Sequence, residues 1–381
     1  MKRGLLIWVE VNQSALSHNI KVFRKLVGPK VLLAPSVKAN AYGHDLIKTS
    51  KIVLKSGADW LCVNALFEAR QLRTAGIKSP IYIMGYVLKK DLPEAVKLKC
   101  RLVVYNHETI KALADAARRL RKKAFIHIKV ETGNNRQGVK MDELEDFVRF
   151  AKRFPQIVIE GIATHFANIE DTTDSSYAHY QLKNFMAAFD GLKKIGVKIP
   201  IRHCANSAAT ILFPETHFDL VRPGIAVYGL WPSEEVKKVA QKKHRLISLE
   251  PVLSWKTRIA QIKEIPKGAF VGYGCTYKTS RRTRIAILPV GYYDGYDRGL
   301  SNKAHVLIHG KRAEVRGRVC MNIIMVDVTN IPQARVEDTT VLLGKDGREE
   351  ITAEQMADWA GTINYEITTR IREGIQRIIV A

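Results

Sequence analysis

The first two thirds of the chain alternate short β-branched runs with longer stretches of helical periodicity. From residue 31 onward, eight runs have the length and composition of buried strands: Val31–Lys38, Trp60–Asn64, Pro80–Gly85, Arg101–Asn106, Ala124–Glu131, Val158–His165, Pro200–Ser207 and Leu220–Tyr228. Four stretches between them predict helices: Ala65–Ala75, His107–Leu120, Asp142–Phe154 and Tyr177–Ile195. An eight-fold alternation of strand and helix predicts an α/β fold with a TIM-like barrel.

After about residue 240 the pattern becomes one of short strands. Val252–Ile265 alternates apolar and polar residues, and a hairpin is expected across His309–Arg312. Further strands are expected at 322–329 and 339–344, with one short helix at Ala353–Trp359. This pattern predicts a mainly β C-terminal domain.

We therefore expect two domains, a barrel at 1–240 and a mainly β domain at 241–381, joined through the charged segment 233–247. A first strand at about 6–12 is placed to pack with the second domain. A chain of 381 residues is long enough for two sizeable cores.

Composition narrows the class of protein. Hydrophobic residues make up 46% of the chain, but no apolar run approaches the roughly 18 residues of a membrane span. The apolar stretch within Met1–Glu10 is too short for a signal peptide. Five widely spaced cysteines without a CxxC pair argue against a disulfide framework or a metal site, so a reducing cytoplasm is expected.

The chain is strongly basic, with a formal net charge of +24. This raises nucleic-acid binding as a rival function. However, the basic clusters at 118–123, 237–245 and 278–284 have no interleaved aromatic residues. Solvated basic faces, or attraction of anionic metabolites, explain the charge more simply. We expect no specific nucleic-acid partner and no membrane partner.

Candidate chemistry lies at the strand ends, where barrels of this kind hold their active sites. Lys38 ends the first strand, and by position alone it is either a Schiff-base lysine or one that reaches solvent. The seventh and eighth strands end in 204–207 and 222–225, where such barrels often bind phosphate. A reactive lysine facing a phosphate site is the layout of a pyridoxal-phosphate enzyme.

Specific motifs strengthen this interpretation. Residues 37–44 read Val-Lys-Ala-Asn-Ala-Tyr-Gly-His, and further matches lie at 164–167, 205–207, 221–225, 272–274, 289–292, 317–321 and 364–367. On these residues the sequence resembles the alanine racemase family of fold-type III pyridoxal-phosphate enzymes, over essentially the whole chain. The resemblance implies a homodimer that interconverts L- and D-alanine and supplies D-alanine for peptidoglycan synthesis.

The resemblance also implies roles for individual residues. Lys38 would hold the cofactor and act as one base, and Tyr273 of a partner subunit would be the base on the opposite face. Arg222 would contact the pyridine nitrogen, with His165 near the ring and connected to Arg222. The phosphate would be held by Tyr42, Ser207, Gly224, Ile225 and Tyr365, and Asn206 would be a further cofactor-binding residue. The substrate would be bound by Arg136, Met321 and Tyr292.

The chemistry is consistent with these roles. Racemisation removes the α-hydrogen from one face and returns a proton to the other, so two bases must flank the carbon. Lysine and tyrosine both titrate near pH 10, so each needs a lowered pKa. Because Arg222 keeps its own proton, it leaves the ring a weaker electron sink, which favours racemisation over transamination. A decarboxylase of the same fold would be expected to place a carboxylate there.

Four positions depart from the family pattern. Asn134 and Asn135 stand where Met-Gly is usual, Asn322 replaces an aspartate, and Tyr293 replaces a small residue. They put the substrate range in doubt more than the reaction. Lys129 matches a lysine that is carbamylated in some relatives and orients the arginine at 136; an unmodified lysine is the alternative.

Three other functions remain open from the sequence. One is a broader racemase acting on serine or basic amino acids. Another is a non-catalytic pyridoxal-phosphate carrier, which would lack the β domain and Tyr273. The third is a basic binding protein, which would show no absorbance from a lysine-linked cofactor.

Overall fold

The structure, a computed structural model, describes residues 4–243 and 247–381 and divides into two compact units. The first, here called the barrel unit, comprises residues 15–41 and 46–250. The second, the β unit, comprises residues 1–14, 42–45 and 251–381.

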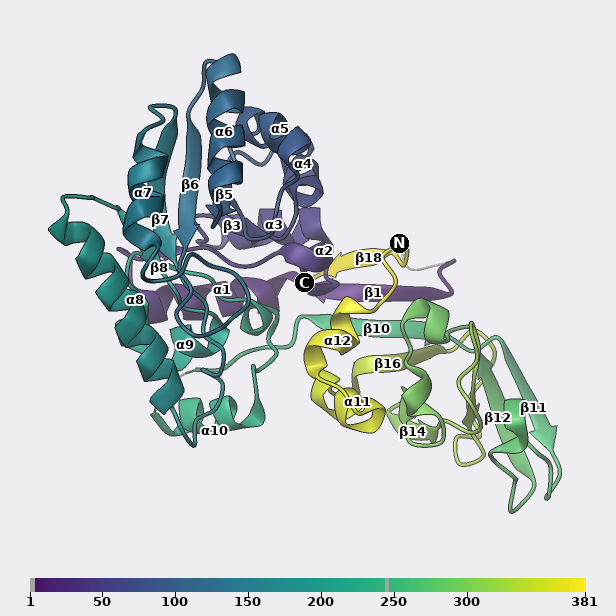
Figure 1. Cartoon of the computed structure of the whole chain (residues 1–381). Coiled ribbons are helices and arrows are strands. Elements are labelled where there is room, and N and C mark those ends of the chain that lie inside the picture. Colours follow the sequence, from purple (N-terminus) through teal and green to yellow (C-terminus); the bar gives the residue numbers. More distant parts are fainter. Residues whose placement is uncertain (1–3, 244–246) are drawn as a thin grey trace. The chain divides into compact units, whose positions relative to one another are not determined.

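The barrel unit is built on a curled parallel sheet (Figure 1). Six strands lie in sequence order: β3 (Leu61–Val63), β4 (Ile81–Ile83), β5 (Arg101–Val104), β6 (Ala124–Lys129), β7 (Ile157–Ala163) and β8 (Ile201–His203). The strands β2 (Leu32–Leu33) and β9 (Leu220–Val221) pair with each other. Backbone bonds from Cys62 N to Pro35 O (3.0 Å) and from Arg222 N to Ala205 O (2.9 Å) connect this pair to the ends of the six-stranded sheet. The predicted α/β fold is confirmed, with strands shorter than expected.

Helices cover the outside of this sheet: α1 (Gln13–Val27), α3 (Leu46–Lys55), α4 (Leu66–Thr74), α5 (Leu92–Lys97), α6 (His107–Arg119), α7 (Leu144–Lys152), α8 (Ser176–Lys194) and α9 (Ser207–Leu212). The four predicted helices correspond to α4, α6, α7 and α8. Helix α7 buries Leu144, Phe147, Val148 and Ala151 at helical spacing, which is the apolar stripe that ties a surface helix to a sheet.

The charged segment 233–247, expected to join the two domains, is helical over most of its length. Residues Glu234–Lys243 form a helix, α10, and residues 244–246 lie outside the described part of the chain. Ser233 accepts a hydrogen bond from Val236 N at 3.1 Å, which caps the first turn. Val236 and Ala240, one turn apart, are buried. The charge count obscured a helix with a narrow apolar face.

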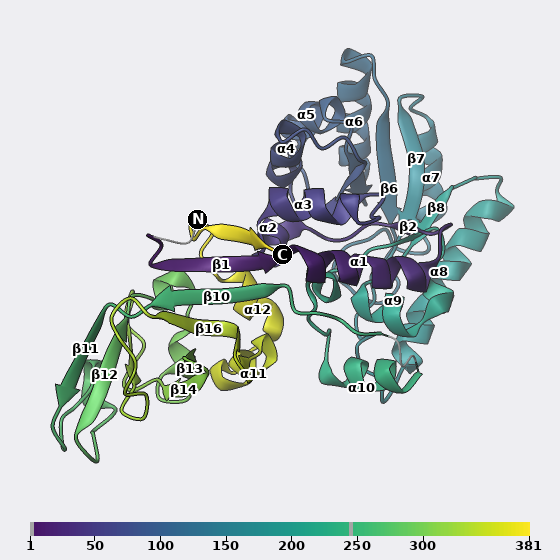
Figure 2. The ribbon, with the colours of Figure 1, turned by 180° about the vertical axis from the view of Figure 1, so that it is seen from behind.

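The β unit contains a larger mixed sheet and a smaller antiparallel one (Figure 2). In the larger sheet β1 (Ile7–Asn12) lies between β10 (Leu253–Arg258), to which it is antiparallel, and β18 (Arg377–Val380), to which it is parallel. The same sheet holds β16 (Thr339–Asp346), β13 (His305–Ile308), β14 (Lys311–Glu314) and β17 (Glu349–Ile351). The predicted hairpin is the β13–β14 pair, which turns at His309 and Gly310.

The smaller sheet joins β11 (Gln261–Ile265), β12 (Thr283–Leu288) and β15 (Ile324–Asp327). The alternating run 252–265 is therefore two strands in different sheets rather than one. Helix α11 (Ala353–Ala360) occupies the predicted helical segment, and α12 (Asn364–Thr369) follows it.

Three further findings bear on function. No helix in the described residues is long and apolar enough to cross a membrane. Within residues 4–243 and 247–381, no group of three metal-ligating side chains is gathered in a way that would hold a metal ion. All five cysteines are free thiols, and three of them are buried: Cys62, Cys100 and Cys204.

Candidate active site

The lysine expected to hold the cofactor begins a left-handed turn, α2 (Lys38–Tyr42). The backbone φ is 54° at Ala39, Asn40 and Ala41 and 52° at Tyr42. Residues with a Cβ rarely adopt this conformation, which costs roughly 1–2 kcal/mol per residue. Four such residues in succession must be held by the surrounding structure.

The turn is held by a buried carboxylate in the first turn of α4. Glu68 accepts hydrogen bonds from the backbone N–H groups of Ala39 (2.6 Å), Asn64 (2.8 Å) and Ala65 (3.0 Å). The side chain of Asn40 accepts a further bond from Leu46 N at 2.8 Å. Sequence reasoning did not identify Glu68, because an acidic residue near a helix start is usually explained by the helix dipole.

The amine of Lys38 lies in an environment that favours its neutral form. Burial and the charge of Arg136 lower the pKa of Lys38, against an opposing effect from Glu68. A neutral amine is the form that attacks a carbonyl carbon or takes a proton. The local structure therefore favours the form of Lys38 that can bond to the cofactor and can act as a base.

Arg136 is presented by the loop that follows β6. Glu131 shapes this loop by accepting hydrogen bonds from Gly133 N at 2.6 Å and Arg136 N at 3.2 Å. The Asn134 amide donates to the carbonyls of His165 and Phe166, both at 3.2 Å. Asn134, which departs from the family pattern, thus connects the loop that carries Arg136 to the loop after β7.

Lys129, at the end of β6, lies among cationic groups. Burial and the charges of Arg222 and Arg136 lower its pKa well below the usual value. The pKa of His165 is also far below its usual range, because of burial and the charges of Lys129 and Arg222. Each shift therefore favours the neutral form of its own side chain.

Arg222 is buried and hydrogen bonded to a residue of β8 and to the residue that directly follows β7. Its guanidinium donates to Thr164 O at 2.9 Å and to Nδ1 of His203. The imidazole that accepts from Arg222 is thus on β8, whereas the sequence pointed to His165. His165 is close enough for the Arg222 charge to affect its pKa. His203 carried no motif signal and was missed.

The residues expected to hold phosphate meet where the segments after β8 and β9 come together. Ser207 Oγ accepts a hydrogen bond from Gly224 N at 2.8 Å, next to Ile225. Asn206 caps α9 by accepting from Ala209 N at 3.0 Å and donates to Glu170 Oε1 at 2.8 Å. The hydroxyl proton of Ser207 is left for another acceptor, as a phosphate-binding serine requires.

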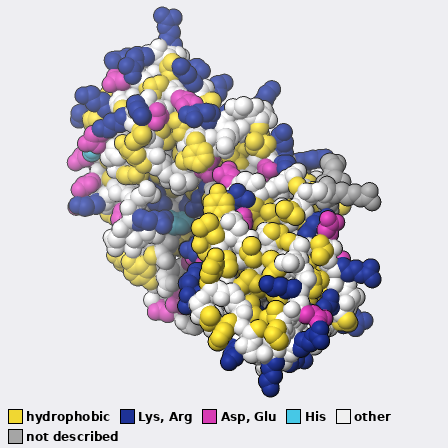
Figure 3. All heavy atoms as spheres, turned by 90° about the vertical axis from the view of Figure 1, so that its right-hand side faces the viewer, with side chains coloured by type: hydrophobic (Ala, Val, Ile, Leu, Met, Phe, Trp, Pro, Cys, Tyr) yellow, Lys and Arg dark blue, Asp and Glu magenta, His cyan; other side chains and the backbone are white. Residues whose placement is uncertain are grey.

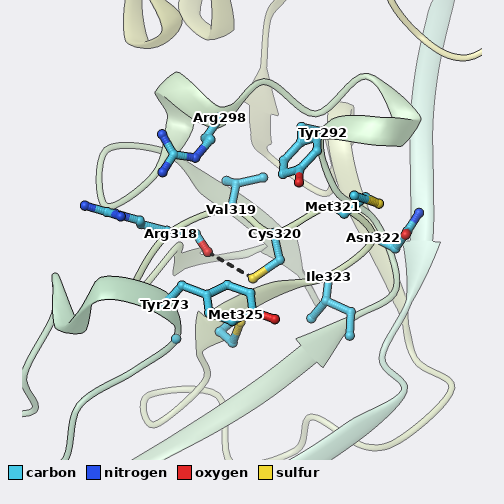
Figure 4. Close-up of a pocket in the computed structure, with 11 residues that line it drawn as sticks. Tyr273, Tyr292, Arg298, Arg318, Val319, Cys320, Met321, Asn322, Ile323 and Met325 are labelled. Carbon is cyan, nitrogen blue, oxygen red and sulfur yellow. Dashed lines mark hydrogen bonds between the residues drawn. The ribbon is translucent and has the colours of Figure 1, made fainter.

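The remaining predicted residues belong to the β unit. Tyr273 begins a short 3₁₀ turn between Gly272 and Gly274, each with a φ of 71°, and its side chain is 73% exposed. It borders an open pocket of about 940 Å³ whose lining includes Tyr292, Arg318 and Met321 (Figure 4).

Close backbone packing shapes this pocket. Tyr292 N donates to Cys320 O at 3.0 Å and Tyr293 N donates to Met321 O at 2.9 Å. A Cβ on Gly291 would lie 2.2 Å from Cys320 O, so only glycine permits this approach. The Tyr293 departure also has a local contact, because the Arg372 guanidinium stacks 4.8 Å from its ring.

Two more predicted residues pack together in the β unit. The ring centroids of Tyr42 and Tyr365 are 6.3 Å apart, and Tyr42 is followed by Gly43. A Cβ on Gly43 would lie 2.1 Å from Thr368 O. The structure therefore places Lys38, Lys129, Arg136, His165, Asn206, Ser207, Arg222, Gly224 and Ile225 in the barrel unit, and Tyr42, Tyr273, Tyr292, Met321 and Tyr365 in the β unit.

The sequence and fold match one family throughout. The models of the alanine racemase N-terminal and C-terminal domains match residues 11–232 and 252–379. An alanine racemase of Desulforamulus reducens is 42% identical over 98% of this chain and 99% of its own. One of Methanococcus maripaludis is 41% identical over 98% of each chain.

Solved structures agree. The alanine racemase of Streptomyces lavendulae has a TM-score of 0.93 at 33% identity, covering 100% of this chain and 98% of its own. The Bacillus anthracis alanine racemase with bound L-Ala-P has a TM-score of 0.92 at 35% identity, covering 99% and 95%. The chain therefore belongs to the alanine racemase family of pyridoxal-phosphate-dependent isomerases.

Proposed function

We propose that this chain interconverts L- and D-alanine with Lys38 and Tyr273 as the two bases. The observation that carries the proposal is the Lys38 turn, where a left-handed backbone held by Glu68 presents an amine whose pKa is lowered by burial and by Arg136. The product would supply D-alanine for peptidoglycan synthesis.

The side chains of the barrel unit fit pyridoxal phosphate. Lys38 offers an amine whose pKa is lowered by burial and by Arg136, Arg222 a guanidinium group, and Ser207 a hydroxyl beside Gly224. We assign the ring nitrogen to Arg222 and the phosphate to Ser207, Gly224 and Ile225, with Asn206 as a further cofactor-binding residue. The family resemblance adds Tyr42 and Tyr365 as proposed phosphate contacts. When bound, the cofactor supplies the electron sink that makes the substrate α-hydrogen acidic.

Arg136 is the proposed partner of the substrate carboxylate. It is exposed, on a loop that Glu131 and Asn134 hold in place, and its charge already acts on Lys38. A guanidinium can bind a carboxylate through two parallel hydrogen bonds, which would fix the α-carbon relative to the base. Met321 and Tyr292 would line the other side of the substrate.

The proposed enzyme is a homodimer in which Tyr273 serves the partner's site. Hydrophobic side chains gather on one face of the β unit (Figure 3). Tyr273, Met321 and Ile323 are exposed and line the same pocket, and they form an apolar patch of a kind typical of an interface. We commit to a second copy of this chain as the occupant, because the proposed second base is itself exposed within the patch.

We also propose that Lys129 carries a carbamate. A neutral lysine amine can add CO₂ and release a proton, which gives a carbamate whose negative charge would lie near Arg222 and Arg136. Arg222 and Arg136 disfavour the protonated form of this lysine, whereas a carbamate would be an anion that both guanidinium groups attract. Mass analysis of the native protein should show one added CO₂ on the peptide that contains Lys129, lost on acidification. An unmodified peptide under native conditions would contradict it.

A panel of L-amino acids, assayed with added cofactor, tests the function. Racemisation of alanine well above that of serine or lysine is expected, whereas equal rates would favour a broad-specificity racemase. Borohydride should fix the cofactor to the Lys38 peptide, and attachment at another lysine would overturn the assignment.

A cytoplasmic location is part of the proposal, supported by the five free thiols.

Complementation tests the shared site. Lys38→Ala and Tyr273→Phe subunits, each inactive alone, should regain activity when mixed, because a heterodimer contains one intact pair of bases. An active species that stays monomeric at assay concentration would contradict this arrangement.

A further inference from the structure

Five polar side chains form an unbroken hydrogen-bonded chain in the barrel unit. The Arg222 guanidinium bonds to Nδ1 of His203, and Nε2 of His203 lies 2.7 Å from Nδ1 of His127. Nε2 of His127 lies 3.1 Å from Glu160 Oε2, which is 3.0 Å from Nε of Arg101. The chain links the C-terminal end of the sheet, where Arg222 lies, to the first residue of β5.

Both imidazoles are fully buried and tightly packed. The ring centroid of Tyr82 lies 4.8 Å from that of His127 and 5.2 Å from that of His203. Gly161 makes room for His127, since a Cβ there would lie 2.3 Å from its Nδ1. The interior of such a barrel is normally filled by branched apolar side chains. A polar chain in this position is stable only if each member is hydrogen bonded.

The donor and acceptor roles leave one arrangement of protons. Arginine can only donate, so Nδ1 of His203 must accept and its proton must be on Nε2. That proton is donated to Nδ1 of His127, whose own proton is therefore on Nε2 and is donated to Glu160. Arg101 donates to both oxygens of Glu160, which must therefore be ionised.

The local electrostatics agree with this arrangement. Burial and the charge of Arg222 hold the pKa of His203 well below its usual value, and burial lowers the pKa of His127. Burial opposes ionisation of Glu160, but the hydrogen bonds from His127 and Arg101 lower its pKa. The two neutral imidazole rings thus lie between the Arg222 cation and the ion pair of Glu160 with Arg101.

We propose that His203, His127 and Glu160 are positioning residues for Arg222, acting as a one-way donor chain that ends on the Glu160 carboxylate. The negative end polarises both rings and makes Nδ1 of His203 a stronger acceptor for the guanidinium. The chain thereby fixes the guanidinium in the orientation that the cofactor ring meets. This last step rests on the proposed contact between Arg222 and the ring nitrogen.

The variant Glu160→Gln separates this role from simple packing. It keeps the volume but removes the charge, and its amide cannot accept from His127 and Arg101 through both of its polar atoms. The matched control is Asp219→Asn, another partly exposed carboxylate of the barrel unit. Asp219 bonds to Arg202 at 2.8 Å and lies outside the chain.

The test is ¹⁵N NMR of histidine-labelled protein without cofactor, with signals assigned through His127→Gln and His203→Gln. Both rings should be neutral with the proton on Nε2, and Glu160→Gln should shift the signals of His203 as well as His127. Asp219→Asn should leave them unchanged. A protonated ring, a proton on Nδ1, or a His203 signal that ignores Glu160→Gln would overturn the proposal. If Glu160→Gln does not fold, the proton positions in the unaltered protein decide.

Loaded enzyme tests the link to the cofactor separately. Glu160→Gln should lower kcat on the order of tenfold, with the cofactor still attached to Lys38 and its visible spectrum shifted. The spectrum of Arg222→Lys distinguishes the two failures. If it is unchanged, the proposed contact between Arg222 and the ring is wrong, although the donor chain can still stand.

Discussion

The backbone N–H of Ala39 donates to Oε1 of Glu68 at 2.6 Å, directly beside Lys38. This bond joins the left-handed turn after β2 to the first turn of α4. The same carboxylate accepts from Asn64 and Ala65 through its other oxygen. The orientation of the proposed catalytic lysine therefore depends on a buried carboxylate that accepts three hydrogen bonds from backbone N–H groups.

Glu68→Gln should destabilise the protein and weaken cofactor attachment. Glutamine has one accepting oxygen, so at least one of the three N–H groups would face an amide donor instead. The loss of a buried hydrogen bond to a charged group predicts a fall of about 1–3 kcal/mol in the free energy of unfolding. Urea denaturation and visible absorbance measure the two effects. The exposed Glu145→Gln serves as control, and a Glu68→Gln protein as stable as that control would contradict the role of Glu68.

The substitution Ala39→Gly should stabilise the protein, although a change from alanine to glycine usually destabilises a helical turn. Ala39 is exposed and has a φ of 54°, a conformation that glycine adopts without steric cost. The gain should be up to about 1 kcal/mol after the larger entropy of the unfolded glycine chain is subtracted. Ala112→Gly, in the middle of the right-handed helix α6, should instead destabilise by about 1 kcal/mol. Effects of the same sign at the two positions, measured by thermal unfolding, would contradict the left-handed turn.

The free energy of unfolding should fall as the pH is lowered from about 7 to 5. Burial lowers the pKa values of His127, His165 and His203 in the folded protein, so these rings take up protons at a lower pH there than in the unfolded chain. In the unfolded chain they take up protons below about pH 6.5. The unfolded state then binds more protons, and stability is lost by up to about 1.4 kcal/mol per pH unit for each ring. Urea unfolding at several pH values measures this, and a flat or rising profile would show that the rings titrate normally.

Much of the fold was predictable because its signals are local. The apolar spacing of α7 and the β-branched strands of the barrel unit each depend on neighbouring residues in the sequence. The pairing of β1 with β10 and β18 was not predictable in detail, since it joins strands hundreds of residues apart. The α10 helix was missed because its two buried residues are outnumbered by lysines.

The candidate site was predictable only where a motif carried it. Lys38 and Arg222 were singled out by their positions at strand ends and by runs that resemble a family, and Tyr273 was found through such a run alone. Glu68 and His203 were not, because a buried acid and a buried histidine show their importance only through their partners in space. The substitution at Asn134 was recognised as a departure, but its bonds to the loop after β7 needed coordinates.

The central claim is that two different residues abstract the α-proton from the two enantiomers. The resemblance assigns D-alanine to Lys38 and L-alanine to Tyr273. Tyr273→Phe removes the hydroxyl but keeps the ring. Tyr277→Phe, on the same segment but packed against the Arg316 guanidinium, is the matched control and should exchange both enantiomers as the unaltered enzyme does.

The most direct test is NMR of α-hydrogen exchange in deuterated water, started separately from L-alanine and from D-alanine with the Tyr273→Phe enzyme. We predict that exchange from L-alanine falls on the order of 10²–10⁴-fold, whereas D-alanine still exchanges through Lys38 without inversion. Equal exchange from both enantiomers, or undiminished racemisation, would contradict the two-base account and show that one base serves both faces.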